Sequence, residues 1–327
     1  MTSSTQTSRL NVDQQPGKPP MLRVEGAWRR GDAARWAAEH RDVLRGAVSE
    51  HGALLVRGLG LSDAAETEAV FRQMGGLMIE REAFAPRRRY DQDVYSASKW
   101  PLNQPMCMHH ELSYAIEPPR LMLFACLQAP TQGGATPVAD ASAVLEALPS
   151  DLVGRFEREG WILTRNYNDE IGATLAEAFG TDDRGAIERY CSAHAIEFEW
   201  RAGGALRTRQ RRHAVVLHPP TGRRCWFNQV AFLNEWTMAP ELREYLVEVY
   251  GEDGLPFNTR FGNGDPVGPD IVQAINQAYD KNTVREPWQA GDLLLVDNVR
   301  TAHAREPFEG PRDVVVGMAD PLRVSVC

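Results

Sequence analysis

The 327-residue sequence has no stretch that approaches the roughly 20 consecutive apolar residues of a membrane-spanning helix. Its N-terminus lacks the basic, apolar and small-residue pattern of a secretion signal. Both absences predict a cytoplasmic chain with no membrane contact. A basic excess is missing too, because 36 Lys and Arg stand against 44 Asp and Glu, which gives a formal net charge of −8. Phosphate binding needs a basic surface, so we expect no nucleic-acid partner.

Cysteine is scarce, and the spacing of the cysteines excludes two classes of small domain. The 5 Cys residues are odd in number, and none lies two or four residues from another. This spacing favours neither a disulfide framework nor a zinc finger. The sequence also contains no GxxxxGK[ST], GxGxxG, HExxH or GxSxG motif. The common nucleotide-binding and hydrolytic signatures are therefore absent.

The composition that remains is that of a globular protein, with 43% hydrophobic and 24% charged residues. Residues 1–20 are polar, are interrupted by Pro and Gly and show no period, so we expect a disordered tail. Apolar residues then recur at helical spacing over 31–51, and a short β-type run follows at 53–56. A second helical pattern covers 62–74. The first eighty residues therefore predict a helix, a strand and a helix.

After residue 80 the pattern changes to short β-type runs that Pro, Gly and Asn separate. These runs lie at 121–127, 161–165, 196–200, 214–217, 225–228, Leu293–Asp297 and 314–318. Helical patterns interrupt them at 141–148, 183–193, Pro240–Tyr250 and 269–279. The pattern favours a mainly β fold with inserted helices, in which a β-sandwich or jelly-roll core is wrapped by helices. A parallel α/β sheet is the weaker alternative.

The segment 106–114 (MCMHHELSY) carries the clearest chemical signal. In an extended strand, residues i and i+2 project to one face, so His109 and Glu111 would point together while His110 points away. An imidazole and a carboxylate are two of the three ligands in the facial triad of non-haem Fe(II) sites. An H-x-E pair by itself is common, and an ion-paired surface strand is the alternative.

Two residues near the C-terminus could complete such a site. His303 follows the apolar run Leu293–Asp297, and a histidine at the end of a buried strand is well placed to reach an interior site. Arg312 precedes a second apolar run at 314–316. A guanidinium that enters a core needs an anion, and its fork matches a carboxylate.

Ordered motifs extend from about residue 50 to residue 320. They are His109-x-Glu111, GGATPVAD at 133–140, His303 and GPR at 310–312, together with HPPTG at 218–222, WFNQ at 226–229, WQAGD at 288–292 and Asp297-Asn298. The set resembles the TauD/TfdA-like family of Fe(II)/2-oxoglutarate dioxygenases. Within that family it is most similar to the syringomycin-type branch, which oxidises amino acids in natural-product pathways.

The resemblance implies a double-stranded β-helix (jelly-roll, cupin-like) core that uses Fe(II), with 2-oxoglutarate and O2 as cosubstrates. It makes His109, Glu111 and His303 the iron ligands. It also makes Arg312 the partner of the distal carboxylate of 2-oxoglutarate, with Thr136 as a hydrogen-bond donor beside it. Because ligands at 109 and 303 must meet at one metal, we expect residues 21–327 to form a single Fe(II)/2-oxoglutarate oxygenase domain.

Two further groups of residues have alternative roles. Trp226 and Asn228 share a face of a predicted strand and could line the substrate pocket, although core packing explains Trp226 equally well. Relatives often carry a second basic residue directly after the arginine, where this chain has Asp313. If that position bound the cosubstrate, Arg323 or Arg305 would have to serve in this chain.

The implied reaction is hydroxylation of an unactivated C–H bond in an amino acid or derivative, free or bound to an acyl or peptidyl carrier protein. Desaturation and epoxidation are further outcomes. Glu111 argues against chlorination, because halogenating relatives have a small residue at that position. Basic runs at 87–89 and 209–212 could dock an acidic carrier, and solvated surface charge is the alternative.

Two other classes of function stay open at this stage. A zinc-dependent hydrolase could use the same His/Glu/His ligands to activate water, but it would leave Arg312 without a role. A non-catalytic jelly-roll scaffold would not need all three ligand types.

Overall fold

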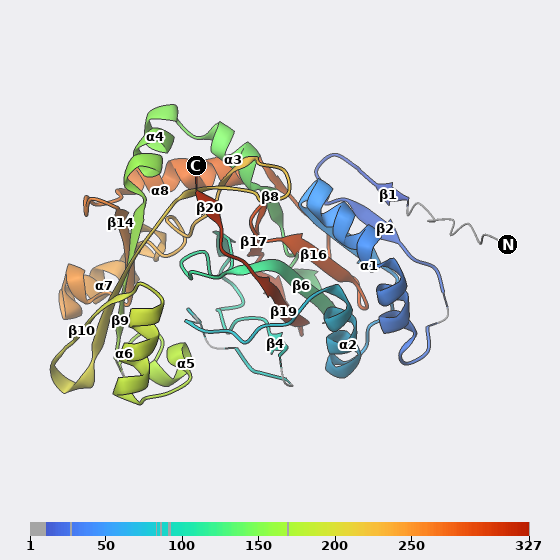
Figure 1. Ribbon diagram of the computed structural model, residues 1–327, viewed down its shortest axis with the longest axis horizontal. Coiled ribbons are helices and arrows are strands. Elements are labelled where there is room, and N and C mark those ends of the chain that lie inside the picture. Colours follow the sequence, from blue (N-terminus) through green and yellow to red (C-terminus); the bar gives the residue numbers. More distant parts are fainter. Residues whose placement is uncertain are drawn as a thin grey trace.

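The computed structural model describes residues 11–26, 28–82, 84–85, 87–90, 93–168 and 170–326. Its largest sheet has the strand order β1-β2-β3-β16-β6-β19-β4 and lies at the centre of Figure 1. The strands are β1 (Val12–Asp13), β2 (Met21–Arg23), β3 (Ala53–Arg57), β16 (Leu293–Asp297), β6 (Pro119–Gln128), β19 (Asp313–Pro321) and β4 (Tyr95–Ser96). Every residue of β3 and β16 is buried, which explains why both read as continuous apolar runs.

Two helices cover one face of this sheet, on the right of Figure 1: α1 (Asp32–His51) and α2 (Ala64–Met74). The buried residues of α1 include Ala33, Ala37, Leu44 and Val48, which recur at helical spacing and form one apolar face. α2 begins after Asp63, whose carboxylate accepts from the Glu66 N–H at 2.8 Å. These helices and the outer face of the sheet share one apolar cluster.

A smaller sheet with the order β15-β8-β17-β5 contributes to the core on the other face of the large sheet. Its strands are β15 (Thr283–Val284), β8 (Val138–Asp140), β17 (Thr301–Arg305) and β5 (Met106–His109). Phe124 and Val314 of the large sheet share an apolar cluster with Val138 and Ala302 of the small one. This pair of sheets is the mainly β core that the sequence predicts.

Inserted elements surround this core. A third sheet lies on the left of Figure 1 and has the order β10-β11-β9-β14. It contains β9 (Trp161–Tyr167), β10 (Glu197–Trp200), β11 (Leu206–Arg212) and β14 (Phe257–Phe261), near α5 (Leu175–Phe179), α6 (Arg184–Ala193) and α7 (Pro240–Tyr250). The remaining elements are α3 (Ala141–Ala147), α4 (Ser150–Glu159), α8 (Pro269–Lys281), β12 (Val215–Leu217), β13 (Arg224–Trp226), β20 (Ser325–Val326), β7 (Gln132–Gly133), β18 (Phe308–Glu309), η1 (Ala202–Gly204), η2 (Glu235–Thr237) and η3 (Glu252–Gly254).

The structure differs from the sequence-based expectation in two segments. Residues 1–10 of the expected tail lie outside the described residues. In the other half of that tail lies β1, which pairs with β2, so paired backbone begins earlier in the chain than expected. β11 was not predicted, because its sequence LRTRQRR resembles a solvated basic run. Its pairing with both β9 and β10 nevertheless buries Arg207 and Gln210. Within the part of the chain described, no helix has the length and apolar character to cross a membrane.

Candidate metal centre

Two imidazoles and one carboxylate meet beside the small sheet. His109 is the last residue of β5, and His303 lies opposite it because β17 pairs with β5 in that register. Glu111 Oε2 lies 3.9 Å from His109 Nε2 and 3.7 Å from His303 Nε2. One ligand atom from each residue lies within 4.8 Å of the others, and all three residues are buried. One metal ion can therefore contact all three side chains.

Glu111 faces the two histidines from a turn, whereas the sequence pattern predicts that it lies in a strand. β5 ends at His109, so Glu111 lies in the following turn and not two positions along an extended strand. Asn298 fixes this turn: its Oδ1 accepts from Glu111 N at 2.8 Å, and its Nδ2 donates to Glu111 O at 2.9 Å. His110 is buried elsewhere, as expected, with its Nδ1 donating to the Asn298 carbonyl at 2.6 Å.

Hydrogen bonding and charge leave the facing atoms of His109 and Glu111 unprotonated. His109 Nδ1 donates to the Cys107 carbonyl at 2.8 Å, so its Nε2 carries the lone pair. Burial and the neighbouring His303 lower the pKa of His109 to about 3. Burial opposes the charge of Glu111, but Arg87 and the two histidines outweigh it and lower the pKa of that carboxyl. Two imidazoles and a carboxylate are the donor set of non-haem Fe(II) sites, so these residues fit that ion.

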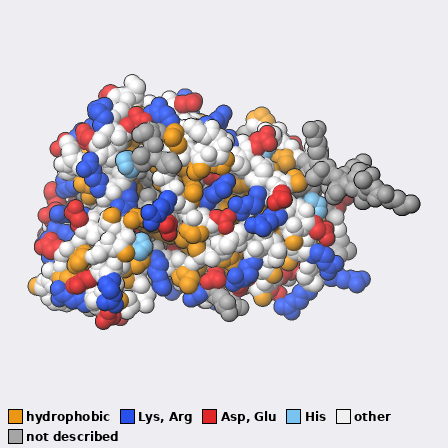
Figure 2. All heavy atoms as spheres, in the orientation of Figure 1, with side chains coloured by type: hydrophobic (Ala, Val, Ile, Leu, Met, Phe, Trp, Pro, Cys, Tyr) orange, Lys and Arg blue, Asp and Glu red, His pale blue; other side chains and the backbone are white. Residues whose placement is uncertain are grey.

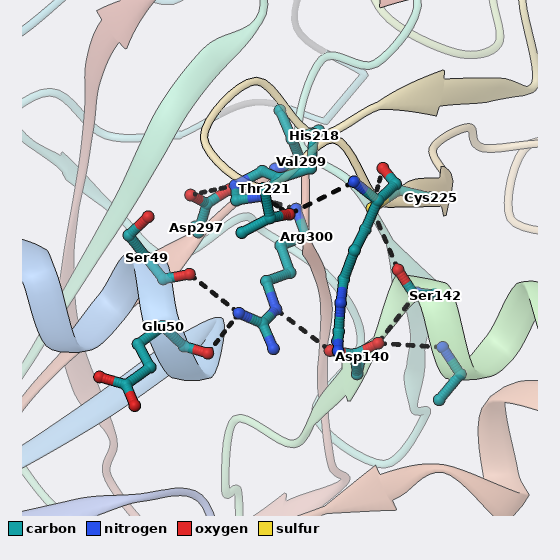
Figure 3. Close-up of polar contacts among 12 residues, drawn as sticks. Ser49, Glu50, Asp140, Ser142, His218, Thr221, Cys225, Asp297, Val299 and Arg300 are labelled. Carbon is teal, nitrogen blue, oxygen red and sulfur yellow. Dashed lines mark hydrogen bonds and ion pairs between the residues drawn. The ribbon is translucent and has the colours of Figure 1, made fainter. Parts of the chain in front are cut away.

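A polar network holds the turn between β16 and β17, the strand that carries His303. Figure 3 shows Asp297, His218 and Arg300 of this network. Asp297 Oδ1 accepts from the backbone N–H groups two and three residues later, and its Oδ2 lies 3.0 Å from His218 Nε2. Arg300 donates from Nε to Asp140 Oδ2 at 3.2 Å and from Nη1 to backbone carbonyls at the end of α1. His218 therefore helps to hold this turn in place, although it lies far from Asp297 in the sequence.

A cavity opens beside the three ligand residues. Its lining includes both histidines, Thr136 and Arg312. The apolar part of the wall comes from Met106, Phe124, Val314 and Val316, among others. The structure thus brings His109, His303 and the two candidate cosubstrate residues to one cavity, with Glu111 next to both histidines.

Arg312 lies directly before β19, with its guanidinium beside the glycine-rich loop that follows β7. Its Nε donates to the Gly134 carbonyl at 3.0 Å, and its Nη2 donates to Thr136 Oγ1 at 3.4 Å. Burial and the nearby Arg305 lower the pKa of Arg312 to about 10. Asp313 does not share this environment, because its carboxylate accepts from the Tyr90 hydroxyl at 2.6 Å.

Gly134 is required for this approach. Its φ is +70°, a conformation that residues with a side chain rarely adopt. A Cβ at this position would lie 2.9 Å from Phe308 Cβ and 3.2 Å from Arg312 Cδ. The second glycine of the GGATPVAD motif therefore lets the backbone come close enough for its carbonyl to bind Arg312.

The alternative cosubstrate residues have other partners. Arg305 also lines the cavity, but its Nη1 and Nη2 donate to the carbonyls of Trp100, Pro101 and Gln104. Arg323 is exposed and pairs with Glu117 at 2.8 Å. Arg305 thus uses both Nη groups on backbone carbonyls and leaves only its buried Nε unfilled, and Arg323 lies at the surface.

Trp226 and Asn228 are used by the fold. Trp226 ends β13 and packs against Phe156 with ring centroids 5.2 Å apart. Asn228 lies beyond the strand, donates to the Ala214 carbonyl and accepts from the Val230 N–H. Neither Trp226 nor Asn228 is among the described residues that line the cavity, so their contact with substrate stays a prediction.

Sequence reasoning missed Arg87, which also lines the cavity. The run Arg87–Arg89 resembles exposed basic surface, and the guanidiniums of Arg88 and Arg89 fit that description. The Arg87 side chain instead turns inward, and its Nη2 donates to Glu111 Oε2 at 2.8 Å. No spacing or periodicity in the sequence distinguishes the inward arginine from its two neighbours.

Comparison with known proteins agrees with this geometry. The family described as "Taurine catabolism dioxygenase TauD, TfdA family" matches residues 16–318. The dapdiamide synthesis protein DdaC of Enterobacter agglomerans is 32% identical over 283 residues, which are 85% of this chain and 85% of that protein. Clavaminate synthase 2 of Streptomyces clavuligerus is 38% identical over 64 residues, 18% of this chain and 20% of that one.

Solved structures are similar over nearly the whole chain. The PvcB protein of Pseudomonas aeruginosa has a TM-score of 0.55 at 16% identity, over 99% of this chain and 97% of that one. AAD-2 in complex with Mn(II) and N-oxalylglycine has a TM-score of 0.51 at 15% identity, over 97% and 99% of the two chains. These likenesses concern the fold, and they confirm the predicted jelly-roll core.

Proposed function

This chain belongs to the TauD, TfdA family and is an Fe(II)- and 2-oxoglutarate-dependent dioxygenase, and we propose that it hydroxylates an unactivated C–H bond of an amino acid or amino-acid derivative. The observation that carries the proposal is the convergence of His109 Nε2, Glu111 Oε2 and His303 Nε2 beside a cavity that Arg312 also lines. Family membership sets aside the zinc hydrolase and the non-catalytic scaffold.

The proposed roles follow from the contacts. His109, Glu111 and His303 hold the Fe(II) ion, since their facing atoms form the matching donor set. Arg312 and Thr136 bind the distal carboxylate of 2-oxoglutarate. In support, Arg312 uses only Nε and Nη2 in hydrogen bonds within the described part of the chain, so its remaining donors are available to an anion.

The bound iron and 2-oxoglutarate would supply O2 activation and the oxidation of the C–H bond. The protein supplies orientation and a dry environment. Phe124, Val314 and Val316 present apolar surface beside the ligands and limit the access of water. Glu111 occupies the position that halogenating relatives leave open, so we propose hydroxylation rather than chlorination, with desaturation or epoxidation as other outcomes of the same site.

The names of two relatives support an amino-acid substrate, since one serves dapdiamide synthesis and the other is a clavaminate synthase. We propose a free amino acid in preference to one on a carrier protein. Of the basic runs considered for docking a carrier, Arg87 binds Glu111, and Arg212 binds the Tyr114 and His194 carbonyls. On the face shown in Figure 2, acidic and basic side chains are interspersed.

An anaerobic spectroscopic titration tests the site. Addition of Fe(II) and 2-oxoglutarate should produce the weak visible charge-transfer band of a metal–keto chelate. His109→Ala and His303→Ala should each abolish this band, whereas His213→Ala, an exposed histidine outside the site, should retain it. Absence of the band from the wild type, or its persistence in either ligand variant, would contradict the proposal. Turnover with zinc and without 2-oxoglutarate would restore the hydrolase alternative.

A further inference from the structure

Arg87 is a buried arginine most of whose hydrogen-bond donors are unfilled. Its side chain is 7% exposed, and its single hydrogen bond among the described residues runs from Nη2 to Glu111 Oε2. Arg87 Nε is buried without a hydrogen-bond partner, and Glu80 Oε1 lies 3.4 Å from it. A guanidinium carries five N–H donors, and leaving buried donors unpaired is costly. Arg87 therefore forms ion pairs with Glu111 and Glu80 and still has N–H donors that no described residue fills.

The unfilled guanidinium faces the same cavity as the candidate metal ligands and Arg312. Arg305 lines the cavity too, but its Nη1 and Nη2 both donate to backbone carbonyls, which leaves only its Nε unfilled. In the proposed function, Arg312 and Thr136 take the distal carboxylate of 2-oxoglutarate, and the other end of that molecule lies at the metal. Arg87 is therefore available to a different anion.

The contact between Arg87 and Glu111 also competes with metal binding. Glu111 Oε2, the atom that accepts from Arg87, is the atom that faces both imidazoles. A divalent ion bound there would draw on the same negative charge and would repel the guanidinium. A metal ion held by Glu111 would therefore weaken the hydrogen bond between Arg87 and Glu111, and would leave the Arg87 guanidinium more open to another anion.

We propose that Arg87 binds a carboxylate of the organic substrate, and that Glu111 and Glu80 hold its guanidinium beside the cavity. This inference rests on the proposed function and narrows its substrate to a molecule with a free carboxylate near the reacting carbon. The planar fork of an arginine matches a carboxylate in two parallel hydrogen bonds. Glu80 is a positioning residue, because its Oε1 pairs with Arg87 Nε at 3.4 Å, next to the Nη2 group that donates to Glu111.

Metal binding alone provides the first test, in Arg87→Met, with Arg88→Met as the matched control. Arg88 is the next residue, and its exposed guanidinium lies over the Tyr90 ring. In an anaerobic titration with Co(II), Arg87→Met should bind the ion at least as tightly as the wild type, because a competing cation has been removed. Weakening of Co(II) binding by more than about tenfold would overturn the proposal, because Arg87 would then orient Glu111 for the metal.

The second test uses the Fe(II)–2-oxoglutarate charge-transfer band as a monitor of substrate binding. The probes are the common L-amino acids, their N-acetyl derivatives and the corresponding α-carboxamides. We expect a subset of the carboxylates to perturb the band in the wild type, their carboxamides to fail, and Arg87→Met to raise the half-saturating concentration at least about 30-fold. Arg87→Lys, which keeps the charge without the fork, should be intermediate, and Arg88→Met should match the wild type.

In this second test the inference would be overturned if no carboxylate perturbs the wild-type band, if a carboxamide is as effective as its acid, or if Arg87→Met responds like the wild type. These results are distinct from failure of the proposed function, in which no band would form with 2-oxoglutarate in the first place. If Arg87→Met instead raises the half-saturating concentration of 2-oxoglutarate by a similar factor, Arg87 binds the cosubstrate and the inference is also wrong.

Discussion

Arg57, which is buried in the large sheet, and Arg312, which is half-buried beside it, use their donors differently. Arg57 donates to both carboxylate oxygens of Asp292, to Glu286 and to the Pro287 carbonyl. Burial opposes the charge of Arg57, but the two acids outweigh it and raise its pKa. Arg312 has no carboxylate partner in the part of the chain described, and burial lowers its pKa to about 10. A filled guanidinium thus stabilises the fold, whereas an open one is ready for a ligand.

The largest effect on stability is expected at the filled guanidinium. Arg57→Met leaves the Asp292 carboxylate, whose side chain is 1% exposed, without its charged partner. Breaking a buried ion pair from one side should lower the free energy of unfolding by about 3–5 kcal/mol. Urea denaturation measures this loss, and the charge-transfer band per folded molecule should not change. A loss below about 1 kcal/mol would show that Arg57 is not a structural residue of this kind.

Substitution of Arg312 should have the opposite effect, which is a large loss of cosubstrate binding and a small change in stability. Arg312→Met should raise the half-saturating concentration of 2-oxoglutarate at least about 30-fold, because a buried carboxylate loses its charged partner. The same change should alter the free energy of unfolding by about 1 kcal/mol or less, since it removes only hydrogen bonds to Gly134 and Thr136. Titration of the band and urea denaturation separate the two effects. A large stability loss with normal cosubstrate binding would abolish the distinction between the two arginines.

A smaller effect on the open arginine is expected from Gly134→Ala. The new Cβ would press on Phe308 and Arg312, so we expect the half-saturating concentration of 2-oxoglutarate to rise roughly tenfold as the guanidinium is displaced. Gly222→Ala is the matched control, because Gly222 has φ +66° with nothing within 4 Å of its added Cβ. Both variants should pay a backbone cost of roughly 1–2 kcal/mol, and only the first should weaken cosubstrate binding. Equal binding in the two variants would argue against a steric role for Gly134.

The sequence predicts much of the fold because the core strands carry local signals. The apolar runs that form β3, β6 and β16 are buried along most of their length, and the helical face of α1 repeats at the expected spacing. The basic sequence of β11 could not be assigned in this way. Its strand character comes from pairing on both edges, which is a long-range effect that a local pattern does not contain.

The sequence and the structure indicate the same three candidate ligands, but the predicted local geometry differs from the observed one. The sequence indicates His109, Glu111 and His303, and the structure brings them together. The strand argument for Glu111 is nevertheless wrong, because Asn298, far away in sequence, positions it in a turn. Arg87 was missed for a related reason: whether an arginine turns inward depends on which acid lies nearby in space, and that acid is 24 residues away in the chain.

The smallest effect is expected at Arg323, a guanidinium that is filled but exposed. Its side chain and that of its partner Glu117 are 76% and 52% exposed, so water screens the pair. Arg323→Met should change the free energy of unfolding by no more than about 0.5 kcal/mol. Because Arg323 pairs at the surface and does not line the cavity, the half-saturating concentration of 2-oxoglutarate should also stay within about twofold of the wild-type value. The same band titration used for Arg312→Met checks this. An equal loss of cosubstrate binding in the two variants would show that donor occupancy and burial do not distinguish ligand-binding arginines in this protein.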